Sequence, residues 1–137
     1  MRIKLFSIFI LILIIPLALT ACGNDDDDTP EINLTTAALN PDSPAGRGAK
    51  VFQTYCATCH VVIGDRKIVG PPLTHIATTA SQRIPNMSAD EYIRESILNP
   101  DSFIVEGFSA GSMQQNFATL LTSDQLDDVA AYLSVLE

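Results

Sequence analysis

Cys56-Ala57-Thr58-Cys59-His60 forms a Cys-x-x-Cys-His motif, and this stretch decides how the rest of the 137-residue sequence is interpreted. On a helical turn, residues three and four apart project from the same side. Both thiols can therefore reach one edge of a porphyrin while the imidazole lies under its iron. The motif is typical of covalent heme attachment, so it predicts one heme c bound through two thioethers, with His60 as an iron ligand.

Other uses of this cysteine pair fit the sequence less well. A zinc site needs four ligands, and beyond Cys56, Cys59 and His60 the remaining candidate is His75, without the paired spacing of a zinc finger. A thioredoxin-like pair requires a strand-helix-strand setting, which the sequence lacks. A structural disulfide would leave His60 without a role.

The residues before the motif predict a helix that carries the cysteines. Ala45, Ala49, Phe52 and Cys56 recur at spacings of four, three and four, which places them on one helical face. We expect this helix to begin near Pro44.

Two further helices are indicated by their capping residues. Ser88 and Glu91 form a capping box, and Asn99 with the following proline ends that helix. Thr122 and Gln125 repeat the capping arrangement before a last amphipathic helix. Hydrophobic staples accompany both boxes.

From residue 44 onward the sequence has no alternating apolar runs of the strand type and no internal repeat. A shorter helix is expected within residues 73–82. The sequence therefore predicts an all-α domain over residues 44–137, with three main helices and a short one.

Residues 44–137 resemble the class I monoheme cytochromes c. The similarity involves the first helix, a Gly-Pro-x-Leu segment and the last helix, at Gly48, Phe52, Cys56, Gly70, Pro71, Pro72, Leu73, Val129, Tyr132 and Leu133. The resemblance implies the cytochrome c fold. It implies that Gly48 allows two helices to cross closely, and that the Pro71 carbonyl accepts the Nδ1 proton of His60.

The candidates for the sixth iron ligand are Met113, Met87 and His75. Met113 is favoured because it lies in a glycine-bearing loop between two predicted helices, and this loop resembles the distal methionine loop of that family. Met87 is explained as the staple residue before a helix, and His75 is expected to be exposed. Gln114 stands where many relatives have a proline directly after the methionine, which bears on the stiffness of the loop.

An apolar wall is expected around the heme, where low polarity limits rearrangement when the charge of the iron changes. Its predicted members are Phe52, Leu73, Ile97, Phe103, Phe108, Phe117 and Leu121.

Residues 1–21 are typical of a secretory signal, with two basic residues followed by an apolar run. Leu19-Thr20-Ala21-Cys22 resembles the lipobox of bacterial lipoproteins, in which the cysteine is acylated. An uncleaved signal anchor is the alternative. Either interpretation predicts an exported protein at the outer face of a membrane, and the first makes Cys22 the site of lipid attachment.

Residues 22–43 are predicted to form an acidic, flexible tether, because an unbroken run of four aspartates and two prolines cannot build a core. Cation binding by the aspartates is less favoured, since a calcium loop needs a glycine turn. The net charge of −8 makes nucleic acid an unsuitable partner.

Three functional hypotheses follow for the predicted domain. With both axial positions filled, the iron could only cycle between Fe(II) and Fe(III), which indicates an electron carrier in a respiratory or photosynthetic chain, rather than an enzyme.

Residues 95–116 are similar to heme domains of cytochrome oxidase subunit II and the monoheme subunit of alternative complex III, so redox proteins or a membrane complex are the expected partners. The alternatives are a heme enzyme or gas sensor with a displaceable sixth ligand, and an assembly module.

Overall fold

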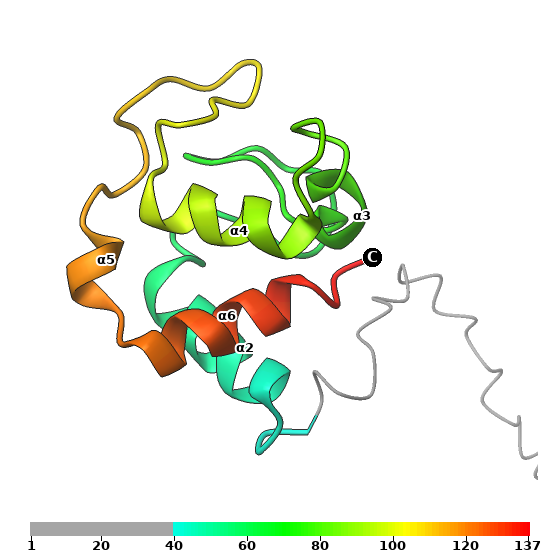
Figure 1. The fold of residues 1–137 in the computed structure, drawn as a ribbon, viewed down its shortest axis with the longest axis vertical. Coiled ribbons are helices and arrows are strands. Elements are labelled where there is room, and N and C mark those ends of the chain that lie inside the picture. The colour runs from blue at the N-terminus through cyan, green and yellow to red at the C-terminus, as the bar shows by residue number, and fades with distance from the viewer. Residues whose placement is uncertain (1–39) are drawn as a thin grey trace, which may run out of the picture. The chain divides into compact units, whose positions relative to one another are not determined.

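The computed structural model describes residues 40–137, and this range is helical, without a β-strand. Its helices, in chain order, are α2 (Pro44–Tyr55), α3 (Ile76–Ala80), α4 (Ala89–Leu98), α5 (Phe117–Leu120) and α6 (Ser123–Leu133). The all-α prediction is confirmed, with three longer helices as expected (Figure 1). The short α5 was not predicted, because its first residue follows Asn116, which makes no side-chain cap.

Helix α2 begins where the sequence predicted. The Ser43 side chain accepts a hydrogen bond from the Gly46 backbone N–H at 3.0 Å, and Pro44 occupies the first turn, where its missing N–H is not needed. On the predicted face, Ala45 and Phe52 are buried. This helix therefore turns its apolar side toward the rest of the domain and delivers the following residue, Cys56, at its C-terminal end.

Both predicted capping boxes are formed. In α4 the Ser88 backbone N–H donates to Glu91 Oε2 at 2.8 Å, and the Ser88 hydroxyl caps the Glu91 N–H. In α6 the Thr122 N–H donates to Gln125 Oε1 at 3.0 Å, and the reciprocal bond is also present. Helix α4 ends at Leu98, as predicted. Satisfied N-terminal donors fix where each helix starts and hence which face it presents to the core.

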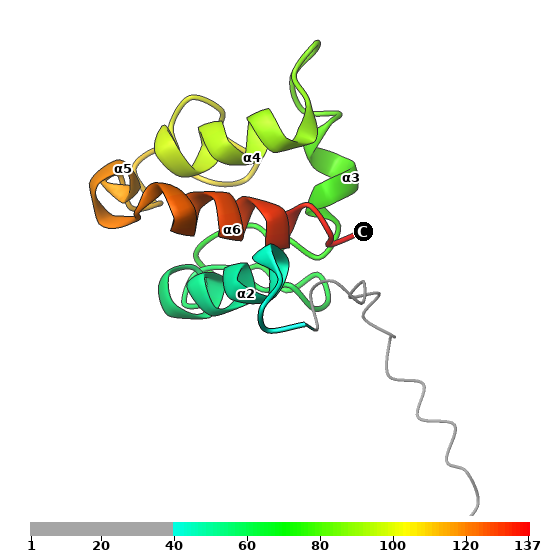
Figure 2. The same cartoon turned by 60° about the horizontal axis from the view of Figure 1, so that its bottom comes forward.

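Helix α6 lies between α2 and α4, and its contact with α2 is the most extensive between helices of the described range (Figure 2). The two backbones cross at Gly48. A Cβ atom there would overlap the Asp128 carbonyl oxygen and lie 2.8 Å from the Tyr132 Cβ. Next to the crossing, the rings of Phe52 and Tyr132 pack with their centroids 5.6 Å apart. The close approach expected of Gly48 is therefore present.

An ion pair ties the same two helices together. Arg47 donates from Nε and Nη2 to the two carboxylate oxygens of Asp128, at 2.8 and 2.6 Å, and from Nη1 to the Asp42 carbonyl. Only 12% of the Asp128 side chain is exposed. The hydrogen bond to Asp128 raises the pKa of Arg47, so the guanidinium stays charged.

No helix described between residues 40 and 137 combines the length and hydrophobicity that crossing a lipid bilayer requires. The predicted signal segment 1–21, Cys22 and most of the predicted tether lie outside the described residues.

Replacing Gly48 with alanine tests the helix crossing. Alanine favours an isolated helix by about 1 kcal/mol, but here its methyl group collides with α6. We expect Gly48→Ala to lower the free energy of unfolding by about 1–3 kcal/mol, the usual cost of overpacking. Urea unfolding followed by far-ultraviolet circular dichroism measures this.

The matched control is Gln53→Ala, at an exposed position of the same helix. It should change the stability by no more than about 0.5 kcal/mol. Equal stability of Gly48→Ala and the wild type would contradict the close crossing.

Candidate heme site

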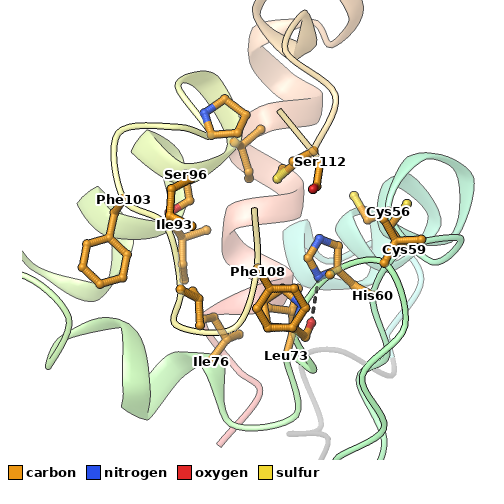
Figure 3. A pocket seen from close by; sticks show the side chains of 18 of the residues that line it. Cys56, Cys59, His60, Leu73, Ile76, Ile93, Ser96, Phe103, Phe108 and Ser112 are labelled. Carbon is orange, nitrogen blue, oxygen red and sulfur yellow. Dashed lines mark hydrogen bonds between the residues drawn. The ribbon is translucent and has the colours of Figure 1, made fainter. Parts of the chain in front are cut away.

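The Cys-x-x-Cys-His motif continues the winding of α2 beyond its last residue. The backbone N–H groups of Cys59 and His60 both donate to the Cys56 carbonyl, each at 3.0 Å. This turn directs the two thiols and the imidazole toward the same cavity (Figure 3). The three groups are thus side by side, as the spacing predicted.

The His60 ring is held in one orientation by the segment that follows. Its Nδ1 lies 2.8 Å from the Pro71 carbonyl oxygen (dashed in Figure 3), and since a carbonyl can only accept, Nδ1 carries the proton. Gly70 donates its N–H to the Cys59 carbonyl at 2.8 Å. A Cβ on Gly70 would overlap the His60 ring. The His60 ring therefore fits against this segment only because residue 70 is a glycine.

This arrangement leaves His60 with a free lone pair. Burial lowers the pKa of His60, and the hydrogen bond to Pro71 opposes that shift. The imidazole is consequently neutral near pH 7, with Nδ1 protonated and Nε2 available as a ligand. The hydrogen bond predicted between His60 and Pro71 is present in the structure.

The cavity has a volume of about 190 Å³ and is mainly apolar. Figure 3 shows Ile93, on α4, facing the side that carries the cysteines and His60, with Ile76 of α3 below it. Of the predicted wall, the members that line the cavity are Leu73, Ile97, Phe103, Phe108 and Phe117.

Two predicted wall residues are placed elsewhere. Phe52 is buried in the contact with Tyr132 of α6, and Leu121 packs on the core after α5. Neither lines the cavity. Lining residues that were not predicted include Ile76, Tyr92 and Ile93, although the apolar spacing of the last two with Ile97 on α4 was a usable signal.

Of the three candidates for the sixth ligand, Met113 lines the cavity together with His60. Met87 is partly buried against the core directly before the cap of α4, and it does not line the cavity. His75 is exposed at the N-terminal end of α3, as expected. The structure thus brings Met113, and neither alternative, into the cavity of the motif.

The ionisation of Cys56 does not favour metal binding, because the thiolate is the form that binds a metal. Burial, with a smaller contribution from Cys59, raises the pKa of Cys56 to about 11, so this sulfur is not a thiolate at neutral pH. Within residues 40–137, no group of three or more cysteine, histidine or acidic side chains is arranged to hold a metal ion. The zinc alternative is therefore not supported by the described residues.

Arg83 provides a separate test of whether a heme fits. It follows α3 and lines the cavity, and its Nε is buried without a hydrogen-bond partner. A buried donor left unpaired is costly. Heme carries two propionate carboxylates, and a guanidinium is the side chain best suited to bind a carboxylate. The unpaired donor therefore fits the group that the motif predicts, and Arg83 would hold a propionate.

The sequence of residues 45–137 matches the family model of cytochrome c. The chain belongs to the cytochrome c family. Membership in this family, together with the two cysteines of the motif, assigns one covalently bound heme c to the chain through Cys56 and Cys59. The cytochrome c fold predicted from the sequence is confirmed.

Among known cytochromes, the chain is similar to cytochrome c6 of Rippkaea orientalis, with 28% identity over 102 residues that cover 74% of this chain and 78% of the relative. Cytochromes c6 of Thermosynechococcus vestitus and Thermostichus vulcanus match over the same length with the same identity, and 77% of each is covered. These relatives support an electron-transfer function for this cytochrome.

Replacing Arg83 tests its contact with the heme. A positive charge beside the heme stabilises the reduced form, because reduction adds an electron. We expect Arg83→Gln to lower the midpoint potential of the holoprotein by less than about 59 mV, the shift that corresponds to a tenfold change in a one-electron equilibrium. Potentiometric titration monitored by absorption measures this, and Arg83→Lys should restore most of the value.

The control for Arg83 is Arg66→Gln, which removes the same charge from an exposed position outside the cavity lining. At moderate salt this distant charge is screened, so the potential should stay close to that of the wild type. Identical shifts in the two glutamine variants would show that Arg83 acts only through net charge.

Proposed function

We propose that this cytochrome is an exported, membrane-anchored one-electron carrier whose iron is ligated by His60 and Met113. The observation that carries the proposal is the convergence of a neutral, oriented imidazole and a thioether on one apolar cavity beside the two attachment thiols. Bound heme supplies a one-electron couple between Fe(II) and Fe(III).

His60 and Met113 set the reduction potential of that couple. His60 offers Nε2, and the hydrogen bond from Nδ1 to Pro71 increases the basicity of the ring. The Met113 thioether favours the ferrous state and so raises the reduction potential. If His60 and Met113 both bound the iron, no position would remain open for a substrate, and the bound heme would supply electron transfer rather than catalysis.

A redox partner would meet this protein at the rim of the cavity. Val69 and Ile104 both line the cavity and are 52% and 38% exposed, so apolar surface lies next to the cofactor. The net charge of the chain is −8. An acidic protein with an apolar contact area suits a partner whose docking site is apolar and surrounded by basic residues.

Such a partner can be a soluble redox protein or a membrane-bound respiratory or photosynthetic complex. The resemblance of residues 95–116 to heme domains of oxidase and alternative complex III assemblies, which is a prediction from the sequence alone, favours a complex, and we propose that the cytochrome serves as a docked subunit. Tethering through Cys22 would keep it close to such an assembly, because several acyl chains give stable anchoring.

The sixth ligand is tested by a matched pair of variants, Met113→Leu and Met87→Leu. Each removes one sulfur with little change in volume. We expect the oxidised wild type to show the weak red absorption band of methionine-ligated ferric heme. Met113→Leu should lose this band, bind cyanide rapidly and have a lower reduction potential, whereas Met87→Leu should behave as the wild type.

Loss of the band in Met87→Leu but not in Met113→Leu would reverse the assignment. Rapid cyanide binding by the wild type, without the red band, would instead support the heme enzyme or gas sensor.

The lipid anchor is tested by Cys22→Ser in cells that produce the holoprotein. Without the thiol no acyl chain can be attached to this position, so we expect the heme protein to move from the membrane fraction to the soluble exported fraction. Membrane washing with high salt, followed by heme staining, measures the distribution. A variant that stays membrane-bound after this wash would support an uncleaved signal anchor instead.

A further inference from the structure

The loop that carries Met113 has no proline directly after the methionine. Gln114 occupies that position, and residues 107–116 between α4 and α5 contain no helix or strand. Gly111 within the loop has a φ of +72°, a conformation that favours glycine. Something other than local backbone stiffness must therefore hold Met113 in place.

A single carboxylate binds the loop on both sides of Met113. Oδ1 of Asp101 accepts a hydrogen bond from the Gly111 backbone N–H at 2.9 Å and one from Gln115 Nε2 at 3.3 Å. Gly111 precedes Met113 by two residues, and Gln115 follows it by two. The carboxylate thus joins the two ends of a five-residue segment centred on the methionine.

The same glutamine also binds the backbone of the methionine itself. Gln115 Nε2 donates to the Met113 carbonyl oxygen at 2.9 Å. An amide NH2 group has two hydrogens, so Gln115 can donate to Asp101 and to Met113 at once. A continuous path of hydrogen bonds therefore leads from the carboxylate to the Met113 backbone.

Asp101 is well placed to act as the fixed end of this path. It follows the buried Pro100, at the point where α4 ends. Asn99 donates its N–H to the Glu95 carbonyl at 2.7 Å, and Ser102 donates to the Asn99 carbonyl at 2.9 Å. These bonds anchor the turn to α4, whose inner face forms a wall of the heme cavity.

We propose that Asp101 is a positioning residue for the sixth ligand: its hydrogen bonds to Gly111 and Gln115 hold the Met113 loop closed over the iron. This inference rests on the proposed ligation by Met113. It assigns the positioning of the loop to a polar contact with the end of α4, and it makes opening of the loop depend on one surface carboxylate.

The test uses the oxidised holoprotein and compares Asp101→Ala with the wild type. Exogenous cyanide can bind only when Met113 leaves the iron, so its binding rate reports how often the loop opens. Removing two hydrogen bonds should increase this rate roughly 5- to 30-fold. The red absorption band should also disappear at a lower temperature than in the wild type.

Two further variants separate positioning from charge. Asp101→Asn keeps an acceptor oxygen and should bind cyanide at a rate close to that of the wild type. Glu106→Gln removes one negative charge from the same loop without removing a hydrogen bond that the structure describes, and it should leave the rate unchanged. Faster cyanide binding in both Asp101→Asn and Glu106→Gln would overturn the proposal in favour of a charge effect.

A double variant tests the hydrogen-bond path. If Gln115 acts through the contact with Asp101, the combined effect of Asp101→Ala and Gln115→Leu on the cyanide rate should be smaller than the product of the single effects. Independent, fully multiplicative effects would contradict a shared path. The helical melting transition should stay near that of the wild type, because Asp101 is exposed.

The outcomes also distinguish this inference from the assignment of the ligand. A wild type with the red band, combined with an Asp101→Ala variant that is unchanged in band and cyanide rate, overturns the positioning role and leaves Met113 ligation intact. A wild type without the band overturns both.

Discussion

The close crossing of α2 and α6 at Gly48 is the constraint on which the heme site depends. It fixes the direction of α2, and the cysteine turn is a direct continuation of that helix. From this turn, a backbone hydrogen bond between Gly70 and Cys59 places the segment that orients His60. The proximal side of the heme is thus built almost entirely from backbone contacts, which few side-chain changes can disturb.

The loop of Met113, the proposed sixth ligand, is held in a different way. Met113 belongs to an exposed loop whose fixed contacts are side-chain hydrogen bonds to Asp101 and Gln115. Such bonds at the surface contribute less than buried packing does, because water competes for the same groups. His60 and Met113, the two proposed iron ligands, therefore differ in rigidity: Gly70 and the Pro71 carbonyl fix the histidine ring, whereas hydrogen bonds at the surface hold the methionine loop.

Local patterns in the sequence were sufficient for the motif and for the starts of the three longer helices. The capping boxes at Ser88 and Thr122 depend on residues three positions apart, so they can be recognised without the fold. The cavity wall was only partly predictable, because the side on which Phe52 and Leu121 lie is decided by how the helices pack. The ion pair of Asp128 with α2 joins residues 81 positions apart and carries no local signal. The lack of a hydrogen-bond partner at Arg83 Nε can be recognised only when the burial of this atom in the fold is known.

That same ion pair has a consequence for the order of events during biogenesis. Helix α2 can pack on α6 only after the chain has been synthesised as far as Asp128, which lies 81 positions beyond Arg47. Until then its apolar face is uncovered and the two thiols remain accessible for heme attachment. The long separation between the crossing helices thus gives time for a covalent modification, and closure of the domain afterwards buries the product.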